Sequence, residues 1–254
     1  MGREKSGGRD IWGYDVVEPS RGWSAAHFVK LANKLIPEIQ NRGKLPIIVG
    51  GTGLYIANLL NPPETLNIPP DKKLRVELEK LPLVELQDRL RKIDQKRFEE
   101  MNESDRSNPR RLIRAIEVVT LKGHKGQKVK RLENTNVLHV ALTGPLYILD
   151  KRIEDRVRQR IGQGVEQEVK GLVEKYGWDS ALKLTIGYKE WRPYFDHKCA
   201  IDEAIKNWTT HEKQYARRQL TWMAKYSPDK LFDISRLNYY QDIEAYVSQW
   251  YHKK

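Results

Sequence analysis

The sequence predicts an α/β fold with a helical insertion and a mainly helical C-terminal part. The first supporting observation is the apolar run KLPIIV at residues 44–49, which is followed by a glycine turn and then by LYIANLL. A buried parallel strand that leads through a turn into a helix has this pattern. The second is the apolar run at residues 137–144, which leads through Pro145 into helical spacing. The third is the helical spacing of most of the chain beyond it.

The helices are predicted from apolar residues that recur every three or four positions. Ser24 is a suitable N-cap for the first of them. Proline-rich text at residues 61–70 opens a charged, helical stretch, which indicates a helical insertion at 62–107 in an α/β core formed by 1–61 and 108–254. The first ten residues and the basic stretch 122–136 are predicted loops. We expect helices at 25–41, 71–80, 83–96, 108–121, 146–160, 163–176, 200–225 and 239–251.

The composition favours a polyanionic partner. The 254 residues include 46 Lys and Arg against 34 Asp and Glu, a net charge of +12. A balance this basic most often indicates nucleic acid. No apolar run is long enough for a membrane span or for the core of a signal peptide, so we expect a cytoplasmic protein with no membrane partner. The single cysteine, Cys199, excludes an intramolecular disulfide, and the scattered histidines show no metal-binding spacing.

The glycine turn Gly50-Gly51-Thr52-Gly53 is the first candidate for chemistry. Glycines at the start of a helix allow close backbone approach, and the first helical N–H groups then face outward and can hold an anion. Thr52 adds a hydroxyl beside that turn. An ordinary strand-to-helix turn with a capping threonine explains the same residues.

Two helices carry arginines in rows. Residues 108–118 (NPRRLIRAIEV) begin a helix on which Arg111 and Arg114 share a face that suits phosphate or carboxylate. On residues 152–160, Arg152, Arg156 and Arg160 follow one another at four-residue steps, as would suit a diphosphate. A solvated helix face with Glu117 as ion-pair partner is the simpler interpretation of the first pattern taken alone, and a surface helix with ion pairs explains the second as well.

Two further stretches are weaker by themselves. Residues 184–190 (LTIGYKE) are a glycine loop with polar groups, and residues 211–222 (HEKQYARRQLTW) interleave Arg217 and Arg218 with aromatic residues, as nucleic-acid surfaces often do. A helix that packs Tyr215, Leu220 and Trp222 inward explains the second stretch as well.

Taken in order, these segments resemble the tRNA dimethylallyltransferases, also called tRNA isopentenyltransferases or the IPP transferase family. The resemblance runs over residues 12–225 and rests on the series WSAAHF (23–28), RGKLPIIVGGTGLY (42–55), NPRRLIRAIEV (108–118), RIEDRVRQRIGQGVEQEV (152–169), IGYKE (186–190) and QYARRQLTW (214–222). It implies a nucleotide-binding, P-loop NTPase-like three-layer core whose helical insertion, 62–107, grips a tRNA anticodon stem-loop.

The resemblance also implies the reaction, which is transfer of a dimethylallyl group from dimethylallyl diphosphate to N6 of the adenosine adjacent to the anticodon. The base is flipped out of its stack to react, as is general for chemistry on stacked bases. Mg²⁺ is the implied cofactor, and the implied state is a monomer.

The site residues implied by the resemblance fall into three groups. Thr52 contacts the target adenosine near its amine, and Arg156 binds the diphosphate, where a fixed guanidinium stabilises the leaving-group charge. The residues implied to contact tRNA, besides Thr52, are Arg75, Arg110, Arg111, Leu112, Ile113, Arg114, Leu184, Thr185, Ile186, Gly187, Tyr188, Lys189, Arg217 and Arg218.

One departure from the family pattern is large. Family members begin with a strand and a GPTASGKT-type phosphate loop, whereas this sequence contains no G-x-x-x-x-G-K-[ST] motif. About 50 residues of the pattern are unmatched, judged by the size of a βα unit and its following strand. They include the ligands of diphosphate and Mg²⁺ and the aspartate that acts as base. We therefore expect an N-terminally incomplete core, with catalysis reduced by orders of magnitude.

Two other functions compete with this one. A non-catalytic tRNA- or RNA-binding protein would keep the insertion and the basic surface and bind tRNA without needing the donor. An adenylate isopentenyltransferase would act on free nucleotides, but the insertion at 62–107 argues against it because a small nucleotide needs no stem-loop grip.

Overall fold

The computed structural model describes residues 3–6, 9–121 and 136–253. The chain forms two compact units. The larger unit comprises Met1–Ala57 and Asn134–Lys254, and the helical unit comprises Asn58–Glu133. The α2 helix (Gly53–Leu60) runs across the division. The predicted basic loop at 122–136 lies outside the described residues except for its last residue.

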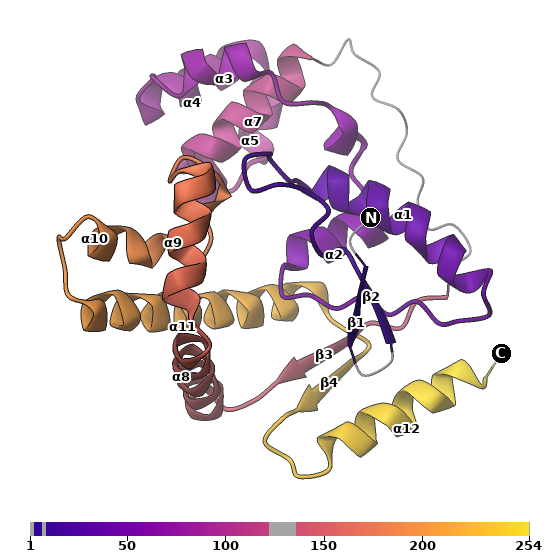
Figure 1. Ribbon diagram of the computed structural model, residues 1–254. Coiled ribbons are helices and arrows are strands. Elements are labelled where there is room, and N and C mark those ends of the chain that lie inside the picture. Colours follow the sequence, from indigo (N-terminus) through magenta and orange to yellow (C-terminus); the bar gives the residue numbers. More distant parts are fainter. Residues whose placement is uncertain (1–2, 7–8, 122–135, 254) are drawn as a thin grey trace. The chain divides into compact units, whose positions relative to one another are not determined.

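The helices of the larger unit agree with the spacing in the sequence. The α1 helix (Ala25–Gln40) begins at Ser24, whose side chain accepts from the backbone N–H of His27 as the predicted N-cap. Further along the chain lie α8 (Leu146–Gly162), α9 (Val165–Tyr176), α10 (Arg192–Phe195), α11 (Ile201–Tyr226) and α12 (Tyr239–Tyr251). Figure 1 shows α8 and α9 running in succession across the long α11, on which α8 packs. A core around Val169, Trp191 and Trp208 holds this group together.

The strands differ from the prediction in three places. Residues 3–6 (β1, Arg3–Ser6) and 9–12 (β2, Arg9–Trp12) form an antiparallel hairpin instead of the predicted loop. The predicted strand at 137–144 is confirmed only as β3 (Val140–Thr143), which pairs in parallel with β4 (Lys230–Asp233). Leu142 on β3 is 52% exposed, so this strand is not the fully buried one expected. The four-residue strand β4 was not predicted from the sequence, and two of its residues are exposed.

The predicted buried strand at 44–49 is wrong. These residues form no strand, and Ile47 and Val49 are 75% and 90% exposed. An extended segment becomes a strand only when a neighbouring strand supplies the ladder of backbone hydrogen bonds, and within the described residues no strand pairs with it. The described residues contain two two-stranded sheets, so the three-layer core that the resemblance implied is not present in them.

The helical unit is built from α3 (Lys72–Leu78), α4 (Leu83–Ile93), α5 (Gln95–Glu100), α6 (Glu103–Arg106) and α7 (Pro109–Thr120), preceded by a 3₁₀ turn at Glu64–Asn67. Leucines of α3, α4 and α7 form its core with Phe98. The prediction placed α7 in the α/β core, with the insertion ending at 107. In the structure α7 belongs to this compact unit because its apolar face packs on α4.

Candidate functional site

One face of α11 contacts three of the segments that the sequence singled out in the larger unit. Trp208, Glu212, Tyr215, Gln219 and Trp222 follow one another at steps of four and three residues, so they lie in one row along the helix. We call these five residues the α11 row. The basic and aromatic character of this stretch is visible in the sequence, but the row was not predicted.

The glycine turn packs against the C-terminal half of the α11 row. The exposed Thr52 has its Oγ1 3.1 Å from the hydroxyl of Tyr215, and either hydroxyl can donate. A Cβ built at Gly53 would lie 2.0 Å from Cδ2 of Trp222, and one at Gly51 would lie 2.8 Å from Nε2 of Gln219. Glycine is therefore needed at position 53 for the approach of the indole ring.

An aromatic neighbour supports the same turn. Tyr55, on the first turn of α2, stacks on Phe28 of α1 with ring centroids 5.2 Å apart. Burial raises the pKa of Tyr55, and the neighbouring Tyr215 raises it further. Tyr55 is therefore a neutral, packed side chain. The anion site suggested for the turn stays a prediction.

Arg156 contacts the α11 row one turn before Tyr215. Its Nη2 donates to Oε2 of Glu212 over 3.1 Å, and the other oxygen of Glu212 accepts from Trp208 Nε1 over 3.3 Å. The Arg156 side chain is 57% exposed. Glu212 and Tyr215 are three residues apart, about 4.5 Å along a helix axis. Thr52 and Arg156, which are distant in sequence, are thus held side by side on one helix face.

The other arginines of this region have separate partners. Arg152 donates to the carbonyl of Ile234 over 3.4 Å, and Arg160 lies over the ring of Trp208. The α8 row of arginines is therefore spread over three partners and does not form one cluster. Arg217 pairs with Asp150 at 3.0 Å, and Arg218 lies over the ring of Tyr215.

The segment 184–190 closes on the N-terminal half of the α11 row. Gly187 has a φ of +91°, and a Cβ there would lie 3.0 Å from Nε1 of Trp208, so both backbone and space favour glycine. Its N–H donates to the buried Glu190 over 2.8 Å, and the other Glu190 oxygen lies 2.7 Å from Nδ1 of His211. Glu190 and His211 lie within the two stretches noted in the sequence, where no role was predicted for them, and they fix this segment to α11.

The remaining predicted residues of the segment differ in exposure. Leu184 and Thr185 are exposed, and Ile186 is half-buried. Tyr188 donates to Glu168 over 2.6 Å, and its pKa is raised chiefly by burial and then by that carboxylate. Lys189 Nζ lies 3.7 Å from Glu190.

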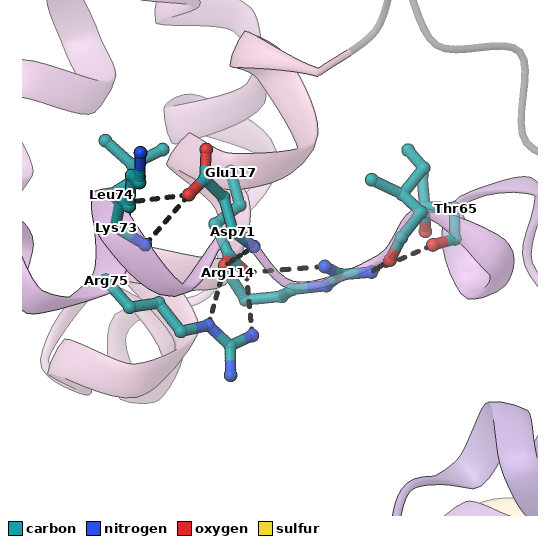
Figure 2. A network of polar contacts seen from close by, with 8 residues as sticks. Thr65, Asp71, Lys73, Leu74, Arg75, Arg114 and Glu117 are labelled. Atoms are coloured by element: carbon teal, nitrogen blue, oxygen red, sulfur yellow. Dashed lines mark hydrogen bonds and ion pairs between the residues drawn. The ribbon is translucent and has the colours of Figure 1, made fainter.

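In the helical unit, a buried carboxylate joins two of the predicted tRNA contacts (Figure 2). Glu117 of α7 is fully buried and accepts from Arg75 Nε and Nη2 over 2.6 and 2.7 Å. Arg114 lies 3.3 Å from the same carboxylate, and its Nη2 also donates to the carbonyls of Thr65 and Ile68. The backbone N–H of Asp71 completes the set at 2.9 Å.

Charge and hydrogen bonds decide the ionisation of Glu117. Burial alone raises the pKa of this carboxyl, but the hydrogen bond and charge of Arg75 lower it, helped by the N–H of Asp71 and by Arg114. The net direction is downward, so Glu117 is ionised at neutral pH. The suggestion that Glu117 is an ion-pair partner of the arginines is confirmed for Arg114.

The neighbouring residues of α7 divide into exposed and buried side chains. Arg110 and Arg111 are exposed, and Arg111 pairs with Asp105. Leu112 and Ile113 are 0% and 6% exposed and belong to the core of the helical unit. These two side chains therefore hold the helix that presents the arginines, and their contact with tRNA stays a prediction.

Neither a metal cluster nor a membrane helix is found in the described part of the chain. No group of three or more His, Cys, Asp or Glu side chains there is arranged to hold a metal ion. None of the helices in the described ranges is long and apolar enough to cross a membrane.

The fold and the site define an α/β, largely helical protein in which an exposed hydroxyl and an exposed guanidinium share one helix face. The sequence pattern of IPP transferase matches residues 6–226. The chain therefore belongs to the IPP transferase family, a family of transferases.

Relatives of known name support this. The chain is 38% identical over 225 residues to a tRNA dimethylallyltransferase of Anoxybacillus flavithermus, covering 87% of this chain and 71% of that protein. It is 36% identical to the enzyme of the same name from Bacillus mycoides, covering 92% and 75%. The match to the relatives thus spans about three quarters of their length.

Solved structures agree in fold. A tRNA Δ(2)-isopentenylpyrophosphate transferase from Staphylococcus epidermidis superposes with a TM-score of 0.62 at 30% identity, covering 94% of this chain and 80% of that one. A full-length tRNA isopentenylpyrophosphate transferase from Bacillus halodurans gives 0.64 at 33%, covering 92% and 76%. A eukaryotic dimethylallyltransferase described as acting on tRNA gives 0.68 at 24%, covering 87% and 60%, which shows the fold alone.

Proposed function

We propose that this chain takes part in tRNA modification, by transfer of a dimethylallyl group from dimethylallyl diphosphate to N6 of the adenosine adjacent to the anticodon. The observation that carries the proposal is the anchoring of Thr52 and Arg156 one turn apart on the α11 row. The family and the names of the relatives supply the reaction class. A tRNA substrate fits the cytoplasmic location expected from the sequence, and we expect the chain to act as a monomer.

In the proposed dimethylallyl transfer, Thr52 contacts the acceptor amine and Arg156 contacts the diphosphate of the donor. The amine nitrogen attacks the allylic carbon of the donor, the C–N bond forms as the C–O bond breaks, and diphosphate leaves with the bonding pair. Arg156 stabilises the charge that develops on the leaving oxygens, and Thr52 accepts a hydrogen bond from the amine, whose nitrogen then gives its extra proton to a base. The resemblance implies an aspartate as the base, and we assign that role to no described residue.

Residues outside the α11 row, several of them arginines, bind the RNA in this proposal. Arg110 and Arg111 are exposed on α7, and Arg75 is 39% exposed beside Glu117. Leu184 and Thr185 are exposed in the segment that packs on Trp208. Contacts of lysine and arginine with phosphates supply salt-dependent affinity, and the pocket of the flipped base supplies specificity.

The rate of the reaction depends on groups that bind the diphosphate and take up the proton. These 254 residues contain no G-x-x-x-x-G-K-[ST] phosphate-loop motif. We therefore propose that these residues by themselves turn over orders of magnitude more slowly than the relatives.

The test is incubation of the chain with dimethylallyl diphosphate and an anticodon stem-loop RNA, followed by mass spectrometry of the nucleosides. Slow formation of N6-dimethylallyladenosine at the expected position, lost in Arg156→Ala, supports the proposal. Salt-sensitive RNA binding without any product supports the non-catalytic alternative. Preference for AMP as acceptor supports the adenylate alternative, and turnover equal to that of a relative contradicts the proposed impairment.

A further inference from the structure

We propose that Tyr215 is a positioning residue that orients the hydroxyl of Thr52 and thereby makes the site selective for an acceptor base with an exocyclic amine. This inference rests on the proposed function, which supplies the contact between Thr52 and the amine. Tyr215 acts through Thr52 and controls this selectivity.

The geometry restricts the Thr52 hydroxyl to one direction. An exposed threonine has several staggered side-chain conformations open to it. Here Oγ1 of Thr52 is 3.1 Å from the hydroxyl of Tyr215, which selects the conformation that makes this bond. Tyr215 belongs to the 26-residue helix α11, and Arg218 lies over its ring at 5.7 Å. The partner of Thr52 is thus on a rigid element.

The packing of the glycine turn fixes the other side of the pair. Space at Gly53 is filled by the ring of Trp222, and space at Gly51 is filled by Gln219. Both side chains belong to the α11 row, so the turn that carries Thr52 and the tyrosine that contacts it are held by the same helix face. A small shift of the turn would move the hydroxyl away from Tyr215.

The selectivity comes from a lone pair that remains free on Oγ1 of Thr52. Each hydroxyl has one hydrogen and two lone pairs, and the bond between Thr52 and Tyr215 uses one hydrogen and one lone pair. Whichever hydroxyl donates, Oγ1 of Thr52 keeps at least one lone pair in a fixed direction for an amine N–H. A purine without the amine offers no donor there and leaves that acceptor unmatched.

Binding of two RNAs measures this without any turnover. The probes are anticodon stem-loops that carry either adenosine or purine riboside at the target position, and the variants are wild type and Tyr215→Phe. We expect the wild type to bind the adenosine RNA about five- to tenfold more tightly, the range of a single hydrogen bond. In Tyr215→Phe the preference should fall below about twofold, with affinity for the purine riboside RNA and the melting temperature unchanged.

Two further variants separate positioning from general packing. Tyr226 lies on the same helix, and its hydroxyl has no hydrogen-bond partner among the described residues. The variant Tyr226→Phe should therefore keep the wild-type preference for the adenosine RNA. Thr52→Val should remove the preference, and adding Tyr215→Phe to it should change nothing more, because the tyrosine acts through the threonine.

The outcomes distinguish the two proposals. If the wild type prefers the adenosine RNA and Tyr215→Phe keeps that preference, the role of Tyr215 alone is overturned. The same holds if the effects of Thr52→Val and Tyr215→Phe on affinity add in the double variant. A wild type with equal affinity for the two RNAs would overturn this inference together with the acceptor contact of the proposed function.

Discussion

Arg75 and Glu117 form a two-point ion pair in which both oxygens of a fully buried carboxylate accept from one guanidinium, at 2.6 and 2.7 Å. The pair joins α3 to α7 in the helical unit. Arg114 shares the carboxylate and also binds the carbonyls of Thr65 and Ile68. Glu117 is therefore the centre that orients two arginines proposed to meet tRNA.

Removal of this carboxylate should destabilise the helical unit strongly. Glu117→Ala leaves two arginines and the N–H of Asp71 without their shared acceptor, and breaking a buried pair in this way costs about 3–5 kcal/mol. The matched control is Asp88→Ala, which breaks an exposed pair with Arg91 in the same unit and should cost at most about 1 kcal/mol. Urea unfolding followed by circular dichroism gives both values, and equal losses would contradict the assignment.

Acid should weaken the same centre. The pKa of Glu117 is lowered from its usual 4.5, so its contribution to stability is fully present above that value and is lost as the pH falls through the lower folded-state pKa. Between pH 6 and acid pH, the unfolding free energy of the wild type should fall by more than that of Glu117→Gln, which cannot titrate. Parallel pH profiles for the two proteins would show that this carboxyl is not the group responsible.

The glycine turn should tolerate a methyl group at one position and not at another. Gly53→Ala places a Cβ into the ring of Trp222, and an overpacked contact of this kind costs about 1–3 kcal/mol. Gly50→Ala meets nothing within 4 Å and should be nearly neutral. Thermal unfolding compares the two, and equal melting temperatures would mean that the turn does not pack on α11 as described.

Two arginines of α7 should behave differently although they are four residues apart. Arg110 is exposed, and its side chain makes no ion pair with the other described residues. Arg110→Ala should therefore leave stability unchanged but reduce the salt slope of tRNA binding by about 0.7–0.9, one phosphate contact. Arg114→Ala should instead lower the stability of the helical unit, since Arg114 holds two backbone carbonyls. Salt titrations of tRNA binding and urea unfolding of both variants measure these effects. Loss of stability in Arg110→Ala, with stability unchanged in Arg114→Ala, would contradict the two assignments.

The sequence predicted the helices well because their signals are local. Ser24 caps α1 as expected, and the apolar row of α7 is buried as its spacing requires. The strand at 44–49 was wrong because a parallel strand depends on neighbours that local composition does not reveal. Pattern alone could not show that Glu117 is buried or that the α11 row joins Thr52 to Arg156, since both depend on long-range packing.

The central claim is that the α11 row brings an acceptor contact and a leaving-group contact together for dimethylallyl transfer. The most direct test is a single-turnover reaction, with the chain in excess over an anticodon stem-loop RNA and with dimethylallyl diphosphate present, in which N6-dimethylallyladenosine is quantified by mass spectrometry. We predict slow product formation, confined to the adenosine adjacent to the anticodon and abolished in both Thr52→Val and Arg156→Ala. Product that forms at an unchanged rate in both variants, or no product at all from the wild type, would contradict the claim.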